Sequence, residues 1–240
     1  MDVLLSTTYF GPVAWYKVLH RADTVFMEAH ENYHKQTFRN RCTIGSEAGP
    51  LSLTVPVSEP AVPCLSGISG KAGNSASPRD RRITSVLVSD HGNWRHLHWQ
   101  ALCSAYRDTP FFPYYADDLR PFFERRDWPT LWQLNEATRD VVCQLLGIHP
   151  HIVPTQRFDA PLTPQPDGIL DLRDSFGPKQ ACPIKCANDD VLPQAQQRLL
   201  AEWAEERPYW QPFLQRHGFI SGLSILDLLF CMGPESVFYL

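Results

Sequence analysis

The N-terminal part of the chain contains two short apolar runs with a helical pattern between them. Residues 3–9 and 24–29 are rich in branched and aromatic side chains, which is typical of buried strands, and residues 13–20 suit a short helix. A strand, a helix and a strand joined by short connections predict a compact, right-handed parallel unit. The loop at residues 7–12 would then lie at the carboxyl end of a parallel strand, where open α/β sheets bind ligands.

Further apolar segments predict more strands. Residues 41–44 and 51–57 suit a hairpin, whereas residues 83–89 suit a strand that leads directly into a helix. Residues 58–82 between them are rich in Pro, Gly and Ser and predict a mobile loop.

Helical periodicity then predominates. Residues 117–125 and 130–146 predict helices that cover one side of the sheet, with Gly147 as a C-terminal stop. Residues 150–193 are rich in Pro and Asp with sparse apolar periodicity, so we expect an extended or partly ordered excursion there. The last segments with a helical pattern are residues 190–205, 210–216 and 223–230.

These elements predict an α/β fold, with a mixed, mostly parallel sheet flanked by helices and a C-terminal helical extension. We expect an α/β core at residues 1–149, the excursion at residues 150–193, and C-terminal helices at residues 194–240 that pack on the core.

Residues 89–107 gather three histidines, two arginines and two tryptophans around the start of one predicted helix. Helical spacing predicts one apolar stripe made of Trp94, Leu97, His98, Ala101, Leu102 and Ala105. Ser89, Asp90 or Asn93 can cap this helix, and its free N–H groups favour an anionic group such as a phosphate. The alternative is an amphipathic helix whose tryptophans belong to the core and whose histidines are hydrogen-bonded within it.

Residues 30–34 read His-Glu-Asn-Tyr-His and match the His-Glu-x-x-His pattern of zinc proteases. That chemistry requires a helix, and here a predicted strand precedes the motif and a polar loop follows it, so we interpret the match as a coincidence. Lys35, Arg39, Asn40 and Arg41 form a cationic turn between two strands. It is either a solvated loop or a clamp for a negatively charged group.

Composition narrows the class of protein. The chain has 240 residues, 43% hydrophobic and 20% charged positions and a net charge of −4, as in ordinary soluble globular proteins. The net negative charge gives no sign of the basic surface that nucleic-acid binding requires. No apolar run approaches the roughly 20 residues that span a bilayer. Asp2 and the missing basic N-terminal region argue against a signal peptide, so we expect a cytoplasmic protein. The seven cysteines fit reduced thiols, and only Cys182 and Cys186 are spaced closely enough for a weak metal or redox signal.

Short motifs occur in a characteristic order along residues 2–148. They are Tyr9 with Trp15-Tyr16, Ala22-Asp23, Lys35 with Asn40-Arg41, Leu53-Thr-Val-Pro-Val57, Trp94 with His98, Tyr106, and Phe111-Phe112. In this order and spacing the chain resembles the WbqC-like family, bacterial proteins often found with surface-polysaccharide (O-antigen, lipopolysaccharide) biosynthesis. Residues 224–230 and 233–235 also resemble members from Bacteroides-like bacteria. Many members have His-Gln-Pro where this chain has Ser6-Thr7-Thr8, so no role of that histidine can be transferred.

His98 is the candidate catalytic residue, because it matches the Trp-x-x-x-His spacing of the family. A carboxylate near a buried His98 would hold its pKa near neutrality, which suits a general base; the alternative is a core histidine bonded to a carbonyl. The expected substrate-binding residues are Thr8, Tyr9, Trp15, Lys35, Asn40, Arg41, His91, Asn93, Trp94, Arg95 and Tyr106. Among them, Asn40, Arg41 and Arg95 would hold a phosphate or an oxyanion, and Tyr9 and Trp15 would form a platform for a sugar or base.

Together these residues predict a cytoplasmic transferase that moves an acyl or aminoacyl group to or from a sugar nucleotide or amino sugar. The alternative is a non-catalytic ligand-binding or scaffold protein of an envelope biosynthesis pathway. We expect an anionic small-molecule substrate, no cofactor, no bound metal, no nucleic acid and no membrane span. The sequence sets no expectation for the donor, the acceptor or the oligomeric state.

Overall fold

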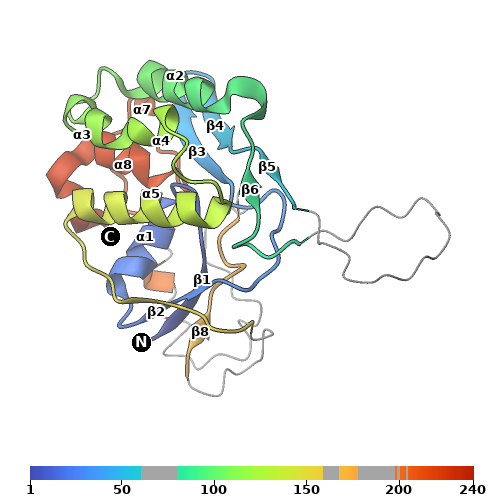
Figure 1. Ribbon diagram of the computed structural model, residues 1–240. Helices are drawn as coiled ribbons and strands as arrows, with labels where there is room; N and C mark the ends of the chain where they lie inside the picture. Colours follow the sequence, from blue (N-terminus) through green and yellow to red (C-terminus); the bar gives the residue numbers. More distant parts are fainter. Residues whose placement is uncertain (61–79, 159–167, 178–197, 199–200, 204) are drawn as a thin grey trace, which may run out of the picture.

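The computed structural model describes the whole chain except residues 61–79, 159–167, 178–197, 199–200 and 204. At its centre is a parallel four-stranded sheet with the strand order β7-β2-β1-β8. The strands are β1 (Val3–Ser6), β2 (Val25–Glu28), β7 (Ile152–Pro154) and β8 (Leu170–Asp171). The expected mixed α/β fold with a mostly parallel sheet is therefore confirmed (Figure 1).

The first strand, helix and strand form the predicted parallel unit. Helix α1 (Val13–Arg21) connects β1 to β2, whose residues pair in register from Val3 with Val25 to Ser6 with Glu28. Side chains alternate across a strand, so Val3 and its neighbours on one face enter the hydrophobic core while the intervening residues face the other side. The exit of β1 then lies at the carboxyl edge of the sheet, as expected.

Both outer strands come from the segment expected to be an excursion. β7 pairs with β2 from Val25–Ile152 to Met27–Pro154, and β8 pairs with β1 through Val3–Leu170 and Leu4–Asp171. Strands of two and three residues are too short to give a periodic signal, which is why the sequence did not predict them. The division of the chain into three parts stays a prediction.

The remaining strands lie outside the parallel sheet. β3 (Arg41–Ser46) and β4 (Gly49–Thr54) form the predicted hairpin, and β5 (Val57–Ser58) pairs antiparallel with β6 (Leu87–Val88). The strand expected at residues 83–89 is wrong over most of its length. Ile83 lies in a turn and its side chain is buried in the core. Its apolar character therefore reflects packing and not strand formation. Most of the loop expected at residues 58–82 lies outside the described residues.

Helices cover the sheet and hairpin (Figure 1). After the short helix η1 (His91–Asn93) come α2 (Trp94–Tyr106), α3 (Phe112–Leu119), α4 (Pro121–Glu124) and α5 (Leu131–Leu146). The single helix expected at residues 117–125 is divided, because Pro121 starts a new turn. α5 begins with a capping box of Thr130 and Gln133 and ends at Gly147, whose φ of 68° is left-handed, as predicted for a helix stop.

The C-terminal part of the chain contains α7 (Leu214–His217), α8 (Ile225–Met232) and η3 (Gly233–Tyr239). Residues 198 and 201–203 are helical, and the rest of the helix expected at residues 190–205 is mostly outside the described residues. α8 is buried along nearly all of its length and contacts α1, α2, α3 and β3, so it is a central core element. None of the described helices is long and apolar enough to cross a bilayer.

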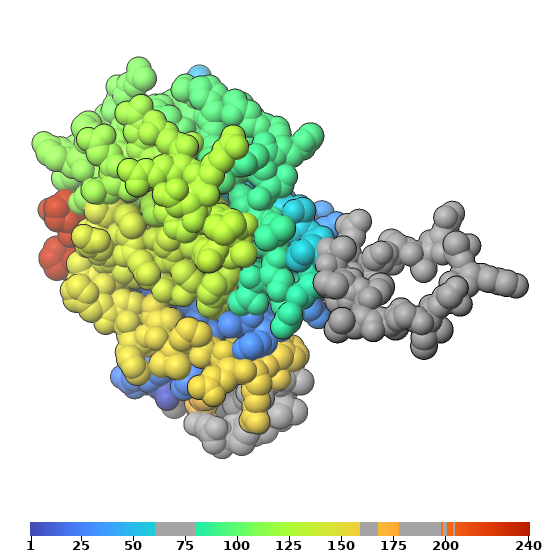
Figure 2. Space-filling model, in the orientation of Figure 1, coloured from blue at the N-terminus to red at the C-terminus, as the bar shows by residue number. Residues whose placement is uncertain are grey.

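In the space-filling view the α2–α5 region forms the upper part of the visible surface, and the chain around β7 forms the lower part (Figure 2).

Candidate functional site

Two rows of side chains cross one face of the parallel sheet. Strand register places Val153, Phe26, Leu4 and Asp171 in the first row. Two residues further along β1 and β2, on the same face, the register partners Ser6 and Glu28 begin a second row. Thr155 and Arg173, just beyond the ends of β7 and β8, complete this row through hydrogen bonds to Glu28. The first row is mostly apolar and the second is wholly polar, so the character of this face changes abruptly at the carboxyl ends of the strands.

The fully buried Glu28 is the centre of the polar row. Its Oε1 accepts hydrogen bonds from the Thr155 hydroxyl and the His30 backbone N–H, each at 2.9 Å, and its Oε2 lies 2.8 Å from Nη1 of Arg173. Arg173 also contacts both carboxylate oxygens of Asp171, at 2.5 to 3.2 Å. Such charge-assisted, multiply bonded contacts fix the end of β8 against β2.

A second buried ion pair, between Arg39 and Glu31, contacts the Ser6 hydroxyl. Arg39 donates from Nε to Glu31 Oε1 at 2.8 Å and from Nη2 to Oε2 at 2.5 Å. The Ser6 hydroxyl accepts from Arg39 Nη2 at 2.7 Å and donates to Glu31 at 3.0 Å. The turn after β2 and the loop before β3 are thereby tied to the end of β1.

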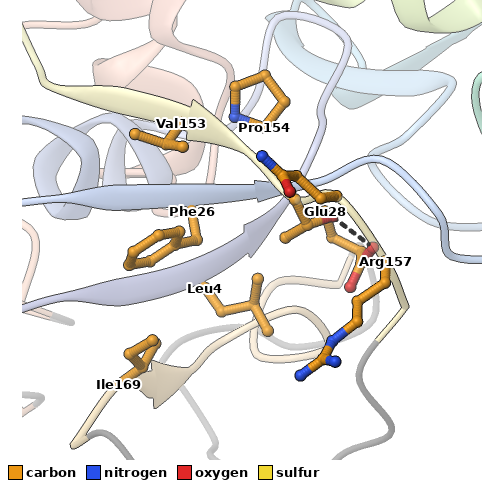
Figure 3. Close-up of a pocket in the computed structure, with 9 residues that line it drawn as sticks. Leu4, Phe26, Glu28, Val153, Pro154, Arg157 and Ile169 are labelled. Atoms are coloured by element: carbon orange, nitrogen blue, oxygen red, sulfur yellow. Dashed lines mark hydrogen bonds between the residues drawn. The ribbon is translucent and has the colours of Figure 1, made fainter.

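A cavity of about 410 Å³ lies on the same face of the sheet (Figure 3). Leu4, Phe26, Val153 and Ile169 give it apolar walls. Its polar lining consists of Glu28, Thr155, Gln156 and Arg157. This volume falls in the range of pockets that hold small molecules.

A much smaller recess has Arg173, the ion-pair partner of Glu28, in its lining. It is lined by Ser6, Thr7, Thr8, Trp15, Phe38, Arg39, Arg173 and Phe176, and its space of about 10 Å³ suits one water-sized group. The Thr8 hydroxyl is buried and has no hydrogen-bond partner among the described residues. A Cβ on Gly11 would come within 2.4 Å of this hydroxyl oxygen, so glycine is needed there.

His98 is packed inside the protein and lines neither cavity. Its ring is 4% exposed and lies among Tyr9, Trp94 and Phe123, with Nδ1 at 3.1 Å from the Tyr9 hydroxyl. Burial lowers the pKa of His98 to about 4, although a hydrogen bond with the Thr54 backbone acts in the opposite direction. The imidazole is therefore neutral at physiological pH.

The start of α2 lies at the surface. His91 and Asn93 are exposed, and Arg95 pairs with Asp90 and stacks on the Trp94 ring, with its guanidinium carbon 4.4 Å from the ring centroid. Asn93 occupies the N-cap position without a side-chain capping bond.

The predicted apolar stripe of α2 is partly wrong. Leu97 is 59% exposed, whereas Trp94, His98, Leu102 and Tyr106 are buried. The buried residues follow one another at intervals of four and form a row along one face of the helix. Leu97 lies outside this row and faces solvent.

The other expected substrate-binding residues are dispersed. Lys35 is exposed, and Arg41 bonds the Thr54 hydroxyl at 3.2 Å. Asn40 is buried and donates to the Val55 carbonyl at 2.8 Å. The fully buried Tyr106 donates to Asp227 at 2.6 Å and accepts from the Gly45 N–H. Of the expected set, the structure brings Thr8 and Trp15 together in the recess and Tyr9, Trp94 and His98 together in the core.

The residues that match the zinc-protease pattern do not form a helix. Residues 30–34 are irregular, and Glu31 is committed to Arg39. Within the described ranges, no group of three or more His, Cys, Asp or Glu side chains could hold a metal ion. Cys182 and Cys186 lie outside those ranges.

Sequence reasoning missed most of the polar row. Glu28 had a usable signal, since a charged residue ending an apolar strand marks a sheet edge. Arg173 and Thr155 had none, because their positions depend on the pairing of short strands far apart in sequence.

The geometry is that of an α/β protein with a ligand-sized cavity and two buried ion pairs at the carboxyl edge of its parallel sheet. The model of the WbqC-like protein family matches residues 7–65 and 73–239, and the chain belongs to this family. A relative from Mycobacterium tuberculosis, uncharacterized protein Rv1507c, is 23% identical over 243 residues, which cover 99% of this chain and 96% of the relative. No solved structure matched the chain.

Proposed function

We propose that this protein is a transferase that acts on a sugar nucleotide or amino sugar in surface-polysaccharide biosynthesis, moving an acyl or aminoacyl group. The observation that carries the proposal is the cavity of about 410 Å³ beside the Glu28–Arg173 pair. Its position agrees with the general rule that open α/β sheets bind ligands outside the carboxyl ends of their strands. The link to O-antigen synthesis rests on what the family resemblance implies.

In this proposal the polar row orients the substrate. Arg157 lines the cavity and takes the role of holding an anionic group, which the sequence had suggested for Asn40, Arg41 and Arg95. The Glu28 carboxylate holds the side chains of Arg173 and Thr155 in place by hydrogen bonds, so it fixes the geometry of the site.

His98 has a positioning role in the proposal. Its contact with the Tyr9 hydroxyl holds the turn that follows β1, and this turn carries Thr8 into the recess. The general-base role first suggested for His98 would require it to reach the substrate from a buried position, with a pKa of about 4.

A reaction assay tests the proposal. Purified protein would be incubated with a panel of sugar nucleotides and amino sugars, each with acetyl and aminoacyl donors, and the products identified by mass spectrometry. The proposal expects one acylated sugar product, lost in Arg157→Gln and retained in Arg125→Gln, which replaces an exposed arginine that does not line the cavity. Absence of any product across the panel would contradict it.

A specific observation favours a second function, a non-catalytic ligand-binding protein of an envelope pathway. Glu28 and Glu31 are each committed to an arginine, and His98 is neutral and enclosed, so none of these three groups is placed to exchange a proton with a ligand. Binding of a sugar nucleotide without conversion in the same assay would select this alternative.

A further inference from the structure

We infer that the cavity binds an acyl group joined to an anionic head. The acyl part lies over Leu4, Phe26 and Val153, here called the apolar row, and the head lies at Arg157. This assignment rests on the proposed function and names the class of donor or acylated product that the site would hold.

The apolar row provides a surface for an acyl group. Leu4, Phe26 and Val153 lie side by side on three adjacent strands, because the register pairs Leu4 with Phe26 and Phe26 with Val153. Ile169 adds a fourth apolar wall. None of these four side chains can hydrogen-bond, so this part of the cavity favours a ligand group without polar atoms.

Polar groups are confined to one end. Along the β7 chain, Val153 lies in the apolar row, Thr155 follows two residues later, and Arg157 two residues after that. Figure 3 shows the Arg157 side chain on the same side of the strands as Leu4 and Glu28. A ligand lying along the strands would therefore have its apolar part over Val153 and its polar head toward Arg157.

The lining favours an anion over a cation. Among the described residues that line the cavity, Glu28 is the only acidic one, and it is fully buried. Three donors already occupy its roughly four acceptor sites, so it offers little to an ammonium group. Arg157 is exposed, and its five N–H donors let a guanidinium bind an anion in addition to other partners.

Isothermal titration with simple probes tests this assignment on the full-length protein. The probes are octanoate, which has an apolar chain and an anionic head, octylammonium, which has the opposite charge, and glucose 1-phosphate, which has the anion without the chain. We expect octanoate to bind at least about tenfold more tightly than either of the others. Arg157→Gln should weaken octanoate binding by about tenfold or more, since a hydrogen bond to a charged group is lost.

Matched variants separate the cavity from general effects. Val153→Thr keeps the side-chain shape and puts a hydroxyl in the apolar row, so it should weaken octanoate binding severalfold. Val88→Thr makes the same change in β6, away from the cavity lining, and Arg125→Gln removes an exposed guanidinium; both should leave binding unchanged.

Octylammonium binding as tight as octanoate, or octanoate binding unaffected by Arg157→Gln, would overturn the assignment. If octanoate does not bind while the reaction assay still yields a product, the assignment fails and the proposed transferase stands. If octanoate binds as expected and no product forms, the cavity assignment stands and the transferase fails.

Discussion

Ser6 and Glu28 are register partners at the carboxyl ends of β1 and β2, and each holds an arginine from a different loop. Arg39 reaches the Ser6 hydroxyl at 2.7 Å, and Arg173 reaches the Glu28 carboxylate at 2.8 Å. Two segments distant in sequence are thus fixed at one edge of the sheet. Glu28 lines the cavity and Arg173 lines the recess, so this ion pair connects the two parts of the candidate site.

Removing Arg173 should strongly destabilise the fold. Arg173→Leu leaves the buried Glu28 without its counter-charge, and breaking a buried pair in this way costs about 3–5 kcal/mol. Arg125→Leu breaks only an exposed pair with Asp127 and should cost less than about 1 kcal/mol. Urea unfolding of the two variants measures the difference. Equal losses would show that Glu28 does not depend on Arg173.

The sequence predicted the elements whose signals lie in neighbouring residues. β1, α1 and β2 have the apolar content and length of a parallel unit, and the Thr130–Gln133 box with Gly147 marks both ends of α5. The polar row could not be predicted, because Arg173 meets Glu28 only after β8 pairs with β1. The Trp-x-x-x-His spacing made His98 a candidate, but its burial is a property of the whole core and determines its protonation state.

Titration of His98 should affect stability in acid. Burial lowers its folded pKa to about 4, so between that value and its ordinary pKa the unfolded chain binds the proton and the folded chain does not. Stability contributed by neutral His98 is therefore present above the ordinary pKa and is lost as pH falls toward 4.

His98→Gln should flatten this acid limb of the stability profile, measured by urea unfolding at a series of pH values. NMR of the imidazole should give a midpoint close to 4. A midpoint between 6 and 7 would instead indicate an accessible, solvated ring.

Asp227 should have the opposite effect on the pH profile. Burial raises its pKa, although hydrogen bonds from Tyr106, Tyr209 and Gln211 act in the other direction. As pH rises from the ordinary pKa through the raised one, the unfolded chain releases its proton first, so the folded state loses stability. The unfolding free energy of wild type minus that of Asp227→Asn should fall over this interval and then level off. A difference that increases with pH would contradict the raised pKa.

Two helix-terminal glycines provide a matched pair of substitutions. Gly147 after α5 and Gly233 after α8 both have positive φ, of 68° and 55°. A Cβ on Gly147 meets nothing within 4 Å, whereas one on Gly233 would lie 2.3 Å from the Phe111 ring.

Gly147→Ala should therefore cost about 1 kcal/mol through backbone strain alone, and Gly233→Ala at least about 3 kcal/mol through strain and overpacking. Thermal unfolding of the two variants provides the comparison. A smaller loss for Gly233→Ala would mean that the Phe111 ring can move aside without cost.

The central claim is that the substrate binds on the sheet face at its carboxyl edge, and methyl NMR tests it most directly. The probe is UDP-N-acetylglucosamine, a sugar nucleotide with both an acyl group and an anionic diphosphate. As the ligand is added, the methyl resonances of Leu4, Val153 and Ile169 should shift and reach a plateau at high ligand concentration. The methyl resonances of the exposed Leu97 on α2 should not shift. Shifts confined to α2, or no shift at the three cavity residues, would contradict the account.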